Sequence, residues 1–228
     1  MNAIQITGLL AIIGAILYAL GDTFLLANKV DINKYPKLIP FKKLLSDSEK
    51  FVSIPSEKMM WGALIGVFAT PLMLAGFWHV HQGLSGANET LRTTTSLLFG
   101  IASVIGAFVH GSFFYAGEYV KALNAVSEDS QNVIVELFNR HRKVLIITYA
   151  PLLIMIVIAS GLFSVAIITS QTLFPNWMAA INPVTMTIAW LLLKRLLPAF
   201  LTDPLEGAGF NVAYFVFFVC TTITLWSA

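Results

Sequence analysis

The chain has 228 residues, of which 57% are hydrophobic and only 11% are charged. Because a soluble domain carries about 25% charged residues, this composition excludes a water-soluble globule, a disordered chain and a nucleic-acid-binding protein. The net charge is only +2, and the single cysteine, Cys220, lies in an apolar run and has no partner for an intrachain disulfide. The composition therefore predicts a polytopic membrane protein.

Six stretches are long and apolar enough to cross a bilayer as helices, which takes about 20 apolar residues each. The first is longer than the apolar core of a cleavable signal peptide, and no basic residue precedes Lys29. Asn182 and Pro183 interrupt the start of the fifth. We therefore predict an all-α bundle of six transmembrane helices in a single domain over residues 1–228, with spans at residues 4–27, 59–80, 94–119, 144–169, 178–197 and 208–226.

Basic residues are distributed unevenly between the two sides of these spans. Only Arg92 falls on one side, and the other 13 fall on the opposite side. Because cytoplasmic loops carry an excess of lysine and arginine, we predict that this second side is cytoplasmic and that both termini face outward. The 13 residues are Lys29, Lys34, Lys37, Lys42, Lys43, Lys50, Lys58, Lys121, Arg140, Arg142, Lys143, Lys194 and Arg195.

The segment 28–58, between the first two spans, is amphipathic. Its apolar positions share one helical face and its lysines lie off that face, which is typical of a short helix at the cytoplasmic interface. A solvated loop with several prolines is the alternative. Residues 130–143 also show a helical pattern and are predicted to extend the fourth span into the cytoplasm. The apolar positions of the first segment are Phe41, Leu44, Leu45 and Val52.

Ionisable side chains within the spans are the candidates for chemistry, because burying one in hydrocarbon costs about 2.5–3.5 kcal/mol. Asp22 shares a helical face with Ala15 and Ala11, and His110 shares one with Gly106. Small residues let neighbouring helices approach closely, so both polar side chains are predicted to point between helices. At about 1.5 Å per residue, Asp22 lies roughly 8 Å and His110 roughly 15 Å from the cytoplasmic edge.

These depths predict a polar pocket that opens toward the cytoplasm. We expect Asp22, His110 and Glu118 to be its catalytic acid–base or proton-relay residues, because a carboxylate beside an imidazole suits proton transfer. Trp61, Tyr115 and Asn211 lie at compatible depths and are predicted to contact the substrate, as is His79 from the outer half. The alternative for each ionisable group is structural: a helix cap for Asp22, a solvated interfacial carboxylate for Glu118 and an interhelical hydrogen bond for His110.

His79 and His81 resemble a metal-binding pair only in sequence. Two positions apart on a helix, their side chains diverge by about 160°, so we predict no shared ion, no metal ligand and no cofactor. No phosphate-binding loop, nucleophile elbow or zinc-protease motif occurs in the sequence.

A series of short motifs resembles an uncharacterised family of bacterial six-helix membrane proteins, known as a domain of unknown function. The resemblance covers roughly residues 8–115 and implies a fold and a bacterial inner-membrane setting, but no activity. It adds weight to Asp22, His79 and His110 as candidate functional residues, because they are the polar residues of the motifs. The family's expected arginine before the second span is Lys58 here. The motifs are Gly21-Asp22 with Leu25-Leu26, Ile54-Pro55, Gly76-Phe77-Trp78-His79 and His110-Gly111.

Three classes of function remain open from the sequence. The first is a membrane enzyme or binding protein that handles a small apolar or amphipathic molecule, or a lipid, in the cytoplasm-facing pocket. The second is a proton-coupled transporter or channel-like protein, which with six spans requires a homo-oligomer. The third is an accessory subunit without chemistry. Membrane lipids are the expected partners and nucleic acids are not.

Overall fold

The structure is a computed structural model that describes residues 1–227. Within this range the chain is helical and has no β-strand. Six helices form the body and two are a single turn long. The elements are α1 (Ala3–Leu26), α2 (Lys42–Leu45), α3 (Ser56–Gly83), α4 (Glu89–Ala125), α5 (Glu128–Thr169), α6 (Pro183–Leu193), α7 (Ala199–Thr202) and α8 (Gly209–Thr224), with 3-10 turns at Ile32–Lys34, Pro36–Phe41, Ser48–Ser53, Asn176–Ala180 and Asp203–Leu205.

Helices α1, α3, α4 and α5 match the first four predicted spans and are each long and apolar enough to cross a membrane. α1 begins at an Asn2–Gln5 capping box, and the Asn88 side chain accepts hydrogen bonds from the first backbone N–H groups of α4. α5 begins at Glu128 and includes the helical extension predicted at residues 130–143.

The last two predicted spans are less regular than we expected. In place of a continuous span over residues 178–197, a 3-10 turn leads to α6, whose 11 residues extend only about 16 Å. Asn182 caps α6 and Pro183 is its first residue, so the interruption seen in the sequence is a helix start. α8 has 16 residues and is bent by 95° from the preceding Ala199–Leu205 segment. The described chain therefore has four long apolar helices, or five with this bent pair.

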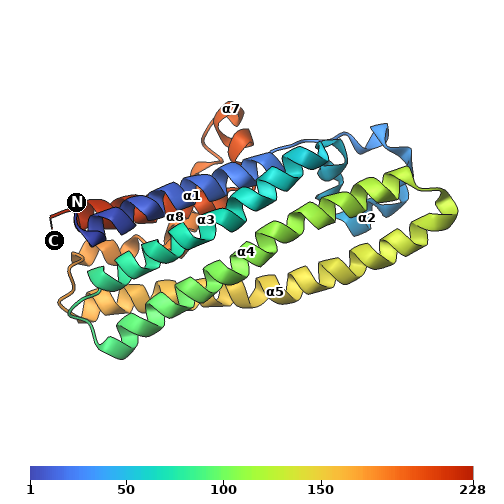
Figure 1. The fold of residues 1–228 in the computed structure, drawn as a ribbon. Coiled ribbons are helices and arrows are strands. Elements are labelled where there is room, and N and C mark those ends of the chain that lie inside the picture. The colour runs from blue at the N-terminus through green and yellow to red at the C-terminus, as the bar shows by residue number, and fades with distance from the viewer. Residues whose placement is uncertain (228) are drawn as a thin grey trace.

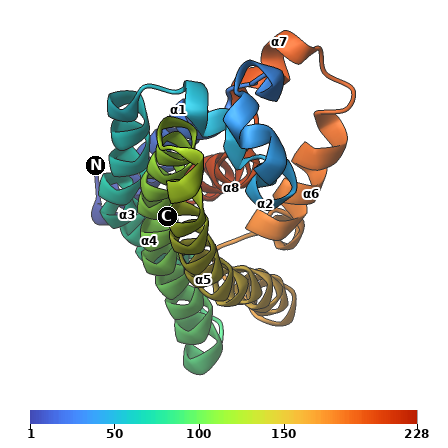
Figure 2. The same ribbon diagram turned by 90° about the vertical axis from the view of Figure 1, so that its right-hand side faces the viewer.

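The long helices lie side by side along one axis, with successive helices antiparallel (Figure 1). The chain starts and ends at the same end of the bundle, where Gln5 donates a hydrogen bond to the Trp226 carbonyl. Viewed down the axis, α8 lies near the centre of the molecule, between α1 and α6 (Figure 2). α8 runs antiparallel to α1, because Asn211 near its start contacts Asp22 and Trp226 after its end contacts Gln5.

Two cores of different composition fill the bundle. The half nearest the termini contains a cluster of buried phenylalanine rings from α3, α4, α5 and α8, with neighbouring centroids 5.0–6.2 Å apart. The other core lies where α4 meets the 27–55 segment. The rings of the first cluster are Phe77, Phe99, Phe163, Phe217 and Phe218.

The 27–55 segment, within the predicted interfacial segment 28–58, does not form one regular short helix through Phe41, Leu44, Leu45 and Val52. It is a series of short turns whose buried residues are Ile32, Leu38, Leu45, Phe51 and Ile54. Ser46 and Asp47 both have positive φ, at 41° and 66°, which stops α2 after one turn. The apolar side chains pack against α4 and α5 in the second core instead of facing outward, which is why the amphipathic pattern arises without a regular helix.

Candidate functional site

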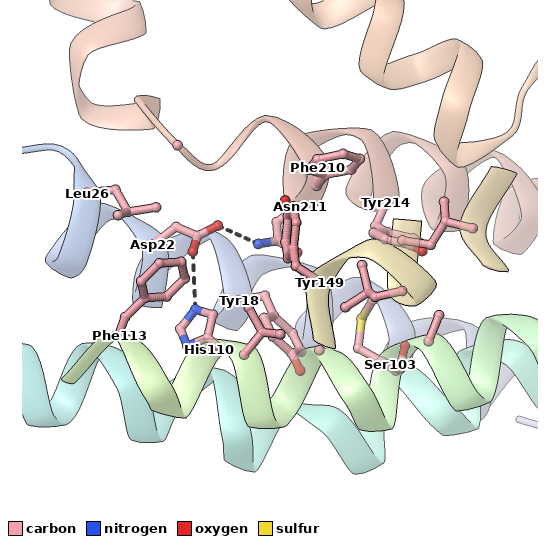
Figure 3. Close-up of a pocket in the computed structure, with 17 residues that line it drawn as sticks. Tyr18, Asp22, Leu26, Ser103, His110, Phe113, Tyr149, Phe210, Asn211 and Tyr214 are labelled. Atoms are coloured by element: carbon pink, nitrogen blue, oxygen red, sulfur yellow. Dashed lines mark hydrogen bonds and ion pairs between the residues drawn. The ribbon is translucent and has the colours of Figure 1, made fainter. Parts of the chain in front are cut away.

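Asp22 of α1 and His110 of α4 meet in the interior of the bundle (Figure 3). Asp22 Oδ1 lies 3.2 Å from His110 Nε2, and the two residues are only 6% and 5% exposed. The sequence predicted that these side chains face one interhelical space, and the structure places them in contact.

Two glycines make room for the imidazole ring. A Cβ atom added to Gly66 of α3 would collide with the ring, and one added to Gly21 of α1 would lie 2.8 Å from His110 Cε1. Tyr18, one turn before Asp22, packs edge-on against the same ring with centroids 5.3 Å apart and an interplanar angle of 86°. In the Gly21-Asp22 pair, Gly21 thus leaves space for the imidazole ring, and Asp22 supplies the carboxylate that contacts it.

The hydrogen bonds of His110 determine where its protons lie. Nδ1 is 3.2 Å from the Ala63 carbonyl oxygen, and because a carbonyl can only accept, Nδ1 carries a hydrogen. In a neutral ring Nε2 would then present a lone pair to Asp22 Oδ1, which a carboxylate would repel. A proton on the pair, as imidazolium with carboxylate or as neutral imidazole with a carboxylic acid, removes this repulsion. The contact is an ion-pair distance without hydrogen-bond geometry, and Nε2 has no hydrogen-bond partner in residues 1–227.

Asn211, near the start of α8, completes the polar group. Its Nδ2 donates a 2.6 Å hydrogen bond to Asp22 Oδ2, the carboxylate oxygen that His110 does not contact (Figure 3). The two oxygens of Asp22 are therefore oriented by two different helices. A carboxylate has about four lone-pair positions, so acceptor capacity remains for a further donor.

The three residues border a cavity of about 140 Å³ between α1, α4, α5 and α8. Apart from this polar group its walls are mainly aromatic and aliphatic, with the hydroxyls of Ser103, Tyr149 and Tyr214 also lining it (Figure 3). The lining residues are Tyr18, Asp22, Leu26, Met73, Ala102, Ser103, Gly106, Val109, His110, Phe113, Tyr149, Leu152, Ile156, Gly207, Phe210, Asn211 and Tyr214.

Four of the predicted site residues lie outside this lining: Glu118, Trp61, Tyr115 and His79. Glu118 is 40% exposed at its side chain and lies 3.9 Å from Lys121 Nζ. Trp61 and Tyr115 are 49% and 59% exposed. Trp61 and Glu118, predicted from their depth to belong to the pocket, do not line the cavity, because equal depth does not fix the direction around a helix. Trp61 is rotated about 100° from its neighbour Gly62, which faces α1.

His79 is fully buried near the opposite end of the bundle. Its Nδ1 lies 2.9 Å from the Ile4 carbonyl oxygen, and its ring lies beside Gly8 and Thr222. His81 instead borders a groove between α3 and α4 that Trp78 also lines. His79 therefore joins α1, α3 and α8 and does not line the cavity. Within residues 1–227 no three His, Cys, Asp or Glu side chains come together as a metal-binding group, so we assign no metal ligand.

The aromatic lining was the part of the site that our sequence reasoning missed. Tyr18 precedes Asp22 by four residues and Tyr214 follows Asn211 by three, so helical spacing alone could have indicated both. Tyr149 and Phe113 gave no such signal, because their positions depend on how α5 and α4 pack against the rest of the bundle.

The family model of DUF6796, a family of unknown function, matches residues 1–228. The chain belongs to the DUF6796 family. Neither a curated protein nor a solved structure matches it. The uncharacterised family that the motifs indicated agrees with this assignment, and the function of this DUF6796 protein is inferred from its own geometry.

Proposed function

We propose that this DUF6796 protein is a multi-pass membrane protein that binds a small amphipathic molecule or a lipid in the cavity between α1, α4, α5 and α8. Asp22 and His110 form its polar contact and act as proton donor and acceptor. One observation carries the proposal: a buried carboxylate–imidazole pair, with Asp22 Oδ1 3.2 Å from His110 Nε2, borders a largely apolar cavity. Burying an ion pair costs desolvation free energy. A pair at the border of a cavity therefore supports a role other than stability.

The outer faces of the helices support the membrane setting. Large apolar side chains are exposed on all four long helices, whereas soluble monomers rarely expose apolar patches above a few hundred Å². Lipid is the environment in which these faces are stable. Examples are Ile13, Phe68, Leu97, Val104, Ile154 and Val157.

A six-pass topology with both termini outside, in the bacterial inner membrane, fits the packing of α8. α8 contacts α1 from Asn211, beside Asp22, to Trp226, beside Gln5. It therefore covers nearly the depth of α1 despite its 16 residues. α6 pairs with α8 and makes the fifth and shortest crossing.

The arrangement favours binding or processing over a channel. The buried phenylalanine cluster fills the half of the bundle between the cavity and the termini, so a polar path to that end is absent from the described packing. The pair is suited to general acid–base catalysis as well as to binding. Proton-coupled transport by a homo-oligomer remains the second candidate because the pair can hold a transferable proton.

The molecules that copurify with the protein test this proposal. We expect mass spectrometry of extracts from the purified wild-type protein to reveal a bound molecule, and Asp22→Asn to lose it. Glu118→Gln is the matched control, because this carboxylate lies at the same end but outside the cavity lining, and it should retain the molecule.

A second variant separates loss of the site from loss of the fold. Gly106→Val places a side chain in the cavity without touching the Asp22–His110 contact, since a Cβ at Gly106 has only Leu152 within reach, at 3.6 Å. It should also lose the bound molecule while it elutes from size exclusion like the wild type. Equal retention by the wild type, Asp22→Asn and Gly106→Val would contradict the proposal, as would a wild-type extract without any bound molecule.

A further inference from the structure

The side chains that line the cavity carry negative charge, apart from the proton that the Asp22–His110 pair can hold. Among residues 1–227, Asp22 is the only acidic side chain of the lining, which includes no lysine or arginine. His110 is the one basic group, and its positive form exists only while the pair holds its proton. When that proton leaves, the cavity carries an uncompensated carboxylate in an apolar environment, where a cation is the favoured replacement.

Aromatic rings make up much of the remaining wall. Tyr18, Phe113, Tyr149, Phe210 and Tyr214 all line the cavity with Asp22. Aromatic faces attract cations through their quadrupole, and clusters of such rings are used to bind organic ammonium groups. The tyrosine oxygens can also accept a hydrogen bond from an N–H group. A carboxylate bordered by aromatic rings, with no lysine or arginine in the described lining, is suited to an ammonium ion and unfavourable for an anion.

The size of the cavity limits the part of the ligand that it can hold. Its volume of about 140 Å³ is close to that of an engineered cavity of about 150 Å³ that binds benzene. Tyr149 and Gly207 belong to the lining and are exposed, so the cavity reaches the surface beside α5 and the start of α8. A larger molecule can therefore place a compact head group inside while the rest extends between these helices.

We propose that the ligand is an organic cation: an amphiphile whose ammonium group displaces the proton of the Asp22–His110 pair and pairs with Asp22, with the aromatic rings around its carbon substituents. This inference rests on the proposed function and names its ligand class. In the exchange the ammonium ion enters, His110 becomes neutral, and the proton passes to solvent, so the net charge of the site is unchanged.

Three benzyl compounds of similar shape test the charge requirement. We expect benzylammonium to bind the purified protein in titration calorimetry about tenfold or more tightly than benzyl alcohol, and benzoate not to bind. Asp22→Asn should remove the preference for benzylammonium over benzyl alcohol. Glu118→Gln should leave all three affinities unchanged, because Glu118 is paired with Lys121 outside the lining.

Proton release gives a readout that a purely structural carboxylate would not produce. Benzylammonium is charged throughout the neutral range, so its binding should release about one proton, seen as a dependence of the heat on the ionisation enthalpy of the buffer. Because the cation replaces a proton, its affinity should fall as pH is lowered. The titratable side chains that line the cavity with His110 are Asp22, Tyr18, Tyr149 and Tyr214, and the Tyr18 hydroxyl is hydrogen-bonded to Thr70 Oγ1 at 2.6 Å.

The outcomes separate this inference from the proposed function. Equal binding of benzylammonium and benzyl alcohol, or tighter binding of benzoate, would overturn the ammonium assignment and leave a neutral or anionic ligand for the same cavity. Failure of the whole series would also overturn it. The proposed function depends instead on the copurification experiment, to which no amine is added.

Discussion

At the scale of single residues, the Asp22–His110 contact depends on side chains that are absent as much as on those that are present. Gly66 and Gly21 leave the volume that the imidazole occupies, and the Ala63 carbonyl fixes which nitrogen is protonated. Asn211 then holds the second carboxylate oxygen. The site is thus built from α1, α3, α4 and α8 together, and its geometry is sensitive to small changes in volume.

Adding one methyl group at Gly66 tests this dependence. Gly66→Ala should destabilise the protein by about 1–3 kcal/mol, because the new Cβ collides with the His110 ring, and moving the ring would disturb its contacts with Ala63 and Asp22. Gly100→Ala is the matched control in α4, since its nearest neighbour to an added Cβ is Leu74 at 3.6 Å, and it should be neutral or slightly stabilising. Apparent melting temperatures in detergent distinguish the two, and equal values would argue against the tight fit.

At the scale of elements, hydrophobic length and helix-capping residues determine most of what the sequence reveals. Residues 4–27 were predicted and α1 is Ala3–Leu26, because a long apolar run and a clear N-cap fix both ends. The predicted span at 178–197 is not one continuous helix, since hydropathy does not register that Asn182 and Pro183 start a new helix. In the 27–55 segment the amphipathic pattern was real, but tertiary packing on α4 and α5 decided its conformation.

The same physical distinction applies to the candidate site. The small residues beside Asp22 and His110 predicted that both side chains point inward, because a face of small residues reflects close helix packing directly. Which way Trp61 and Glu118 point depends on the rotation of α3 and α4 relative to their neighbours, and a depth estimate contains no such information. Tyr149 could not be predicted for a further reason: its place in the cavity depends on how far α5 lies from α8.

The start of α6 provides a test at this scale. The Asn182 side chain accepts hydrogen bonds from the backbone of Val184 and Thr185 and donates to Ser164 of α5 and to the Ala179 carbonyl. Asn182→Ala should therefore lower the stability by about 1–2 kcal/mol through loss of the cap. Asn176→Ala, at an exposed position nearby, should change the melting temperature little. Similar values for both variants would mean that the Asn182 cap contributes little to stability.

At the scale of the whole molecule, the basic residues gather at the end of the bundle opposite the termini. Contacts among separate loops join them there: Lys37 donates to the Val126 carbonyl, Arg142 to the Leu44 carbonyl, and Lys29 pairs with Asp203 at 2.7 Å. The Lys29–Asp203 pair is exposed and adds little stability. The cavity lies nearer to this end than to the termini, since Asp22 is four residues from the end of α1. A cytoplasmic orientation of this end would open the cavity toward the cytoplasmic side of the membrane.

The topology of the molecule can be tested by labelling single cysteines in intact cells. In a Cys220→Ala background, Ser85→Cys should react with a membrane-impermeant maleimide from outside, and Lys42→Cys should react only after the cells are opened. Both positions are exposed, and Ser85 is preferred to Gly86, which has φ of +97° and would place a Cβ against the Gln171 carbonyl. The physical reason is that 13 of the 14 basic residues lie on the Lys42 side, and cytoplasmic loops retain positive charge. Labelling of both positions from outside, or of Lys42→Cys alone, would reverse the assignment and place the opening of the cavity on the outer side.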